Sequence, residues 1–228
     1  MGQKVHPKSF RLGVIGSWRS RWFGKNNFHQ MLEEDTKIRD FLKRKLKDAG
    51  VADIVIQRSP RLITVVVHTS RPGLIIGRGG SGVEELRAQI KEMVQAPGKK
   101  IDVKVNIEEI RNPHASAELV AQIVAEQLEK RIAFRRVLKQ TLDKVMEARG
   151  VQGAKIMVAG RLNGADMGRR EWLSQGNIPL HTLRADVDFA RGSAHTTYGI
   201  VGIKVWIYKG EVFRDKSENS QSAKKSKR

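Results

Sequence analysis

The order of the structural elements predicted between residues 36 and 109 constrains the fold of this chain more than any single element does. Apolar residues at helical spacing predict a first helix that ends at Gly50, and two β-branched runs joined by Ser59-Pro60 predict a hairpin. Pro72 opens a short helix, a glycine-rich stretch follows, and a second long helix leads to an alternating strand. The order helix, strand, strand, short helix, glycine loop, helix, strand predicts an α+β domain.

The glycine-rich stretch reads Gly77-Arg78-Gly79-Gly80 and matches the pattern G-x-x-G. Between two helices, such a loop lets a nucleic-acid backbone approach closely, because glycines carry no side chain and the second helix offers free N–H groups to phosphate. Arg78 would be the projecting cation of this loop. The pattern alone is common, so a plain glycine-rich helix start is the alternative interpretation.

The same stretch also satisfies G-x-G-x-x-G through Gly77, Gly79 and Gly82, so a dinucleotide-binding fold has to be considered. In that fold the loop follows its strand directly within a βαβ unit, whereas here residues 70–76 intervene and a hairpin is predicted upstream. The chain also contains no G-x-x-x-x-G-K-[ST] phosphate loop. We therefore expect neither a dinucleotide site nor an ATP or GTP site, and no small-molecule substrate.

The second half of the chain predicts another α+β domain, with two helices packed on a mainly antiparallel sheet. Asn112-Pro113 predicts the start of the first helix, as an N-cap followed by proline. The two helices and four strands are expected at 113–131, 132–149, 153–161, 167–175, 181–190 and 196–208. The domains meet near Arg111 with almost no linker.

The predicted organisation has four parts. We expect a basic N-terminal arm at 1–35, the first domain at 36–110, the second domain at 111–213 and a disordered basic tail at 214–228. The tail is polar and contains no large apolar residue. The N-terminus lacks the charged-then-apolar order of a secretory signal, so we expect the arm to belong to the mature protein.

The net charge restricts the partners that such a chain can bind. It has 43 Lys and Arg residues against 24 Asp and Glu residues, a formal charge of +19, which selects for polyanions such as nucleic acid. There is no cysteine, which excludes disulfides, thiolate metal sites and cysteine nucleophiles. No apolar run is long enough for a membrane span. We expect a cytoplasmic protein without a membrane partner.

Two basic groups of residues are candidates for phosphate contacts. Arg131, Arg135 and Lys139 are spaced at i, i+4 and i+8 and predict one row along the second helix of the second domain, with Arg136 beside it. No acid occurs between Lys130 and Thr141, so the row is uncompensated and suited to tracking phosphates. A solvated helix face is the alternative.

The other group lies in the arm, where aromatic residues alternate with cations. The cations that we expect to contact RNA are Lys4, Arg11, Arg19 and Arg21. The rings of Trp18, Trp22 and Phe23 could stack on unpaired bases or could anchor the arm on the globular body, and the sequence leaves both open. Because aromatic residues are scarce overall, we expect recognition of RNA backbone and shape more than base stacking.

One cluster suggests catalysis at first reading. Asp186 and Asp188 share a strand face, and His181 and His195 flank them in sequence, so metal binding or acid–base chemistry is conceivable. Arg184 lies on the same face, however, and a local ion pair explains the pattern more simply. We expect no catalytic residue, no metal site and no enzymatic activity.

The element order with Leu74-Ile75-Ile76 before the glycine loop resembles a KH domain of the prokaryotic type (type II). Further motifs recur along the whole chain up to about Phe213: Met1-Gly2-Gln3-Lys4-Val5-His6-Pro7, Arg11-Leu12-Gly13, His68-Thr69-Ser70-Arg71-Pro72-Gly73, Phe134-Arg135-Arg136, Pro179-Leu180-His181-Thr182-Leu183-Arg184-Ala185-Asp186 and His195-Thr196-Thr197-Tyr198-Gly199. Together they resemble the bacterial form of the small-subunit ribosomal protein S-three family (universal uS-three family).

This resemblance implies a two-domain structural constituent of the small ribosomal subunit, in its head, bound to small-subunit ribosomal RNA on the side where mRNA enters. It implies neighbouring ribosomal proteins as partners and no cofactor. It also implies that the basic residues at Arg135, Arg136 and Lys139 grip incoming mRNA and are associated with its unwinding. The family's loop usually has two variable basic positions, whereas this chain has Arg78 followed by Gly79.

Two other hypotheses stay open at the level of the sequence. One is a free-standing KH-type RNA-binding regulator or assembly factor. The other is a nucleic-acid-processing enzyme such as a nuclease, which would depend on Asp186.

Overall fold

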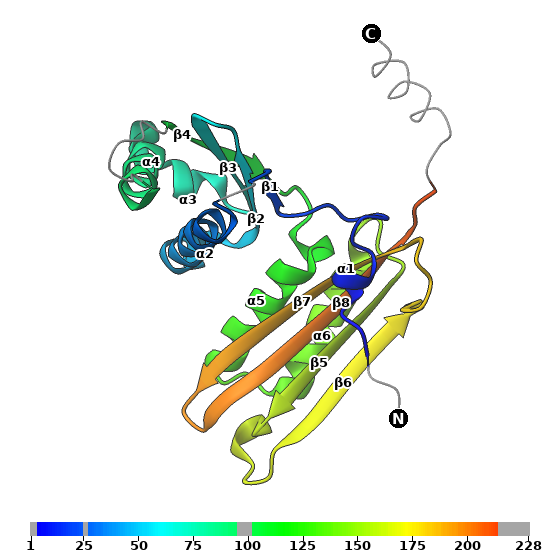
Figure 1. Cartoon of the computed structure of the whole chain (residues 1–228). Helices are drawn as coiled ribbons and strands as arrows, with labels where there is room; N and C mark the ends of the chain where they lie inside the picture. Colours follow the sequence, from blue (N-terminus) through cyan, green and yellow to red (C-terminus); the bar gives the residue numbers. More distant parts are fainter. Residues whose placement is uncertain (1–3, 25–26, 95–101, 214–228) are drawn as a thin grey trace.

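Each half of the chain builds its own four-stranded sheet, and helices cover one face of each sheet (Figure 1). The computed structural model describes residues 4–24, 27–94 and 102–213. The strand order is β1-β2-β3-β4 in the first sheet and β6-β5-β8-β7 in the second. The predicted α+β class is therefore confirmed, whereas the tail expected at 214–228 lies outside the described residues.

The first domain contains the predicted elements in the predicted order. They are α2 (Phe28–Lys45), a 3₁₀ turn (Lys47–Ala49), β2 (Val51–Arg58), β3 (Leu62–Thr69), α3 (Pro72–Ile76), a 3₁₀ turn (Arg78–Gly80), α4 (Ser81–Val94) and β4 (Asp102–Glu109). β2 and β3 form an antiparallel hairpin, and β4 runs parallel to β3. Ile38 of α2 and Ile90 of α4 are fully buried in one cluster with Val65 of β3. The parallel pairing requires a crossover, and that crossover carries the glycine loop.

The N-terminal arm is part of the first sheet, because β1 (Ser20–Arg21) pairs in parallel with the edge of β2. α2 begins well before the boundary that we predict after residue 35, so that boundary falls inside a helix and is wrong as a structural division. The reason is Asp35, a fully buried carboxylate of α2. It accepts hydrogen bonds from Ser20 Oγ at 2.7 Å and from Trp22 Nε1 at 2.8 Å, which joins the arm to the helix.

The second domain has two helices on the inner face of an antiparallel sheet. Its elements are a 3₁₀ turn (Pro113–Ala115), α5 (Ala117–Glu129), α6 (Phe134–Glu147), β5 (Gly153–Gly160), a 3₁₀ turn (Leu162–Gly164), β6 (Arg169–Gly176), β7 (Ala185–Thr196) and β8 (Gly199–Glu211). Val124 of α5, Leu138 of α6 and Ile203 of β8 belong to one buried cluster between these layers. Across the described residues of both domains, no helix combines the length and apolar character needed to span a bilayer.

The starts of α5 and β7 lie furthest from the sequence prediction, at Ala117 and Ala185. Asn112-Pro113 opens only a 3₁₀ turn, and α5 begins at Ala117, whose N–H donates to the carboxylate of Asp188 at 2.9 Å. The cap of α5 is thus supplied by another element of the fold. β7 begins at Ala185 instead of residue 181, because carbonyl groups just before it bind a side chain of the arm and not a neighbouring strand.

The arm also binds the second domain through α1 (Pro7–Phe10), which lies against β7 (Figure 1). The His6 ring meets the Phe189 ring edge-on at 4.7 Å, and Lys8 Nζ lies 2.8 Å from the Asp188 carboxylate. The domains also touch directly, where the Gln122 amide donates to the Val51 carbonyl at 2.8 Å. The N-terminal arm therefore contacts both domains, the first through β1 and the second through α1.

Arg11 is the centre of this attachment, and its predicted role in RNA binding is wrong. Its side chain is buried, and its guanidinium donates to the carbonyls of Pro7, Pro179, Leu180 and Thr182 at 2.9–3.1 Å. Burial lowers the pKa of Arg11, and the nearby Asp186 carboxylate partly offsets this effect. A guanidinium enclosed in this way is unavailable to a phosphate group.

Replacing Arg11 by alanine should lower the free energy of unfolding by about 2–4 kcal/mol, because one buried and three half-buried carbonyls lose this donor, and each unsatisfied buried group costs about 1–3 kcal/mol. The measurement is urea unfolding followed by circular dichroism. Arg21→Ala is the matched control in the same arm, since Arg21 is exposed, and it should change stability by no more than about 0.5 kcal/mol. Equal unfolding midpoints for the two variants would contradict the structural role of Arg11.

Candidate nucleic-acid interface

The glycine loop joins α3 to α4 and depends on left-handed backbone conformations. Gly77, Gly79 and Gly80 have φ angles of +70°, +61° and +84°. A Cβ atom at Gly79 or Gly80 would meet nothing within 4 Å, so this part of the loop is open to a close-approaching backbone. A Cβ at Gly82 would instead lie 2.5 Å from the Ile75 carbonyl oxygen. The third glycine of the G-x-G-x-x-G match therefore serves the packing of α3 against α4.

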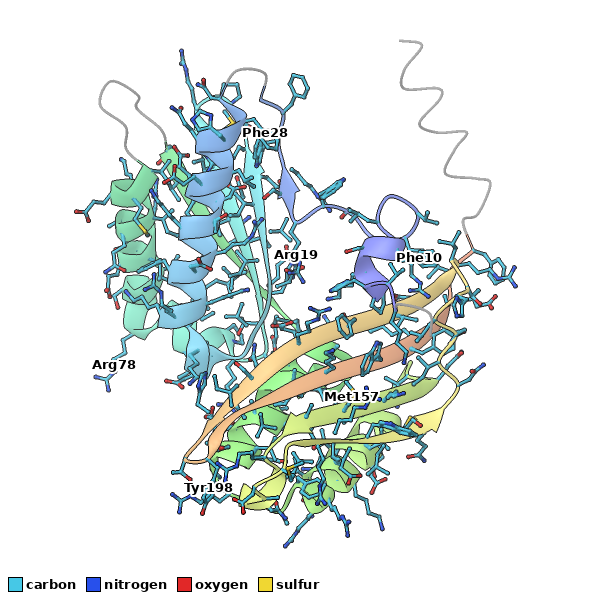
Figure 2. The ribbon with its side chains drawn as sticks, turned by 60° about the horizontal axis from the view of Figure 1, so that its bottom comes forward. Phe10, Arg19, Phe28, Arg78, Met157 and Tyr198 are labelled. Carbon is cyan, nitrogen blue, oxygen red and sulfur yellow. The ribbon has the colours of Figure 1, made fainter. Side chains whose placement is uncertain are left out.

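Arg78 is the cation that this loop presents. Its side chain extends from the ribbon at the end of the first domain (Figure 2), and the residue is exposed. Within the described part of the chain it forms no ion pair, and its carbonyl accepts a hydrogen bond from Ser81 Oγ at 3.0 Å. Because Gly79 occupies the second variable position, the loop offers one positive charge together with backbone N–H groups.

The predicted basic row on α6 is correct for three of its four members. Arg135, Arg136 and Lys139 are exposed, while the opposite face of α6 is buried. None of the three forms an ion pair with a described residue. Arg131 lies outside the helix, in the turn after α5, with φ +60° and its N–H donating to the Leu128 carbonyl at 3.0 Å. It is exposed beside the row but not part of it.

One cation of this surface, Arg169 at the start of β6, is not predicted from the sequence pattern. Its guanidinium lies 5.6 Å from the centre of the Phe134 ring, and that of Arg135 lies 5.8 Å from the same ring. The residues are far apart in sequence, so only the packing of β6 against α6 brings them together. The neighbouring pattern Arg169-Arg170 was the only signal available.

The remaining arm residues divide between anchoring and exposure. Arg19 forms an ion pair with Asp53 at 2.9 Å, and Arg21 donates to Ser17 Oγ at 2.8 Å, both at the surface. Lys4 is exposed beside the second sheet. Trp22 is an anchor, as its bond to Asp35 shows. The other two rings are open: Trp18 and Phe23 are 68% and 89% exposed. Trp22 therefore anchors the arm, whereas stacking of bases on Trp18 or Phe23 stays a prediction.

Of the two carboxylates that suggested catalysis, Asp188 has clear structural partners. Asp188 binds Lys8 and the N–H of Ala117, with Lys209 Nζ at 3.8 Å. Burial raises the pKa of Asp188, but these positive and hydrogen-bonding groups outweigh burial and hold it below its usual range. The predicted ion pair with Arg184 is wrong, because Arg184 binds Glu211 across the strands at 2.7 Å.

The histidines near these carboxylates complete no metal site. The backbone N–H of His195 donates to Glu129 at 2.9 Å, and His181 is exposed in the turn before β7. In the parts of the chain that the structure describes, no group of three or more His, Cys, Asp or Glu residues could hold a metal ion.

The strand order and the loop geometry define the class of the first domain. A hairpin with a parallel third strand, and an open G-x-x-G loop in the crossover between helices, make the first domain a prokaryotic-type KH domain, a class of RNA-binding module. The family model of the KH domain matches residues 37–115, and that of the ribosomal protein S3 C-terminal domain matches residues 124–207.

Similar proteins extend over nearly the whole chain. A small ribosomal subunit protein uS3 of Syntrophomonas wolfei is 47% identical over 98% of this chain and 96% of its own length. The protein of the same name from Desulfitobacterium hafniense is 51% identical over 93% and 94%, and that from Burkholderia cenocepacia is 49% identical over 92% and 77%. The chain therefore belongs to the ribosomal protein S3 (uS3) family.

If the glycine loop contacts phosphate, a negative charge in the loop should weaken RNA binding. Gly79→Asp should weaken the binding of a short RNA, because a carboxylate then stands beside Arg78 where phosphate would approach. Gly79→Asn is the matched control, since both residues tolerate the left-handed backbone of this open position and only one is charged. The measurement is filter binding, with circular dichroism to show that both variants are folded. Equal affinities of the two variants would show that the loop is not part of the RNA-binding surface.

Proposed function

We propose that this protein is a structural constituent of the small ribosomal subunit, which binds ribosomal RNA in the head and presents basic residues to mRNA where it enters. The observation that carries the mRNA contact is the exposed, unpaired set Arg135, Arg136 and Lys139 on α6. Family membership supports the ribosomal RNA contact and a location in cytoplasmic ribosomes.

Each surface has a physical task in this proposal. The glycine loop and Arg78 approach the backbone of RNA, while Arg19 and Arg21 contact phosphates beside the first sheet and Lys4 contacts them beside the second. The cations of α6 displace counterions from mRNA and hold it. The chain has no phosphate-loop motif, so it acts as a passive grip, and energy for unwinding mRNA comes from elsewhere in the translating ribosome.

Sedimentation tests membership of the small subunit. The purified, labelled chain should co-migrate stoichiometrically with small subunits assembled in its presence and should remain bound in high salt, because a structural component is enclosed by RNA and neighbouring proteins. A regulator or assembly factor would wash off under the same conditions, and that outcome would contradict the proposal. RNA cleavage that depends on a metal ion and is abolished by Asp186→Asn would favour a nuclease instead.

The salt dependence of RNA binding tests the cations of α6. Replacing Arg135, Arg136 and Lys139 together by alanine should flatten the plot of log affinity against log salt by about 0.7 for each lost single-strand phosphate contact. The measurement is the affinity for a single-stranded RNA at several salt concentrations.

A second triple variant is the matched control for lost charge. Lys37, Arg87 and Lys130 are already paired with Glu33, Asp102 and Glu126, so their replacement by alanine should leave the slope nearly unchanged. An unchanged slope in the α6 variant would mean that its cations are only solvated.

A further inference from the structure

The outer face of the second sheet, opposite α5 and α6, carries a group of basic and aromatic side chains. The strand register places Met157 between Trp172 of β6 and Lys204 of β8, and Lys155 between Ser174 and Trp206. Arg191 of β7 lies opposite Lys204. Met157 lies in the middle of this face, which looks toward the viewer in Figure 2, with the helices behind the sheet. We call Lys155, Met157, Arg170, Trp172, Arg191 and Lys204 the outer-face patch.

The charge of the outer-face patch is of one sign. In the register of β5–β8 the acid that shares this face is Glu211, opposite Ala185 at the far end of β8, where it is paired with Arg184 and not with the patch. Lys155, Arg170, Arg191 and Lys204 form no ion pair with any described residue. Positive charge without local compensation on a flat surface favours a polyanion.

The aromatic residues of this face differ in their exposure. Phe189 and Trp206 are buried, with only 4% and 8% of their surface exposed, in the cluster under α1 and residues 178–180. Trp172 is 54% exposed, and Lys155 Nζ lies 4.8 Å from its ring centre. Trp172 therefore remains available for stacking, with a cation held beside it.

A second ammonium group approaches Lys155 from the arm. A hollow of about 240 Å³ is lined by Lys4, Lys155, Ser174 and Trp206. Burial and the charge of Lys4 both lower the pKa of Lys155, as expected for two like charges without an anion between them. An anionic group in the hollow would relieve this repulsion and could accept a hydrogen bond from Ser174.

We propose that the outer-face patch binds an unpaired segment of RNA, with one base stacked on Trp172 and the adjacent phosphates held by Lys155, Arg191 and Lys204. The inference rests on the proposed function and adds a second mode of RNA contact to it. A protein partner fits less well, because the centre of a protein interface is depleted of charge, whereas lysine residues flank Met157 and Trp172 at the centre of this face. A base offers its π-face to an indole regardless of sequence.

The test measures binding of the full chain to a fluorescein-labelled 12-nucleotide single-stranded RNA by anisotropy at fixed salt. Trp172→Ala should weaken binding by at least about fivefold, and Trp172→Phe should restore most of the affinity, because a ring is retained. Tyr198→Ala is the matched control: its ring is 55% exposed and also lies beside a cation, Arg161, but at the tip of the β7–β8 hairpin. An affinity of Trp172→Ala equal to that of Tyr198→Ala would overturn the proposal.

A charge-reversal pair tests the phosphate contacts. Arg191→Glu with Lys204→Glu should weaken RNA binding by at least tenfold relative to Lys37→Glu with Lys130→Glu, which changes the net charge equally at residues that already have acidic partners. A glutamate-rich peptide that binds in a Trp172-dependent manner, while the RNA is insensitive to Trp172, would assign the patch to an acidic protein and overturn the proposal.

The outcome is distinguishable from failure of the proposed function. If the chain sediments with small subunits and the α6 variant loses its salt slope, while Trp172→Ala binds RNA normally, only this inference fails. If the chain washes off the subunits but Trp172→Ala still loses affinity for RNA, the proposed ribosomal role is contradicted, whereas RNA binding by the outer-face patch is supported.

Discussion

Burial of two charged groups, Arg11 of the arm and Asp35 of α2, is the constraint on which the arrangement of this molecule depends. Asp35 draws the second part of the arm into the first sheet, and Arg11 fixes the first part to the second domain. Both groups are buried with several hydrogen-bond partners, as a buried charge requires. Arg58 completes the site of Asp35 with a 2.7 Å bond from Nε. Removing Asp35 would take the acceptor from Trp22 Nε1, and removing Arg11 would take a donor from the carbonyls of Pro179 and Leu180.

This attachment matters for the proposed function because the groups that we propose to bind RNA belong to different domains. The glycine loop lies in the first domain, whereas the cations of α6 and the outer-face patch lie on opposite sides of the second. Binding to one RNA-containing particle through several of these surfaces requires that their relative positions be fixed. The arm provides this by pairing β1 with β2 and packing α1 on β7, in addition to the direct contact between α5 and β2.

The acidic residues of the chain are used mostly for structure. Asp35 and Asp188 join the arm to the two domains, and Asp188 also caps α5. Exposed acids on α2, α4 and α5 pair with nearby lysines, such as Glu85 with Lys45 at 2.7 Å. The excess of cations is therefore left unpaired on α6, on the glycine loop and on the outer-face patch. A high net charge destabilises a compact chain by self-repulsion, and a polyanion relieves it.

Much of the fold could be predicted from local sequence patterns. Apolar periodicity and β-branched runs predicted the KH element order, and glycine's tolerance of positive φ predicted the loop. The predicted starts of elements were less accurate where a residue distant in sequence determines them, as Asp188 does for α5. Helical spacing also correctly placed Arg135, Arg136 and Lys139 on one solvent-facing side of α6.

What the spacing of residues could not reveal is which charges the folded chain encloses. Arg11 resembles the other arm cations in sequence, and only the carbonyls of residues 179, 180 and 182 converging on it make it structural. Arg131 fits a helical row until a left-handed turn removes it. The outer-face patch draws on four strands and becomes visible only through their register. Contacts between residues distant in sequence decide burial, and burial decides which charges can reach RNA.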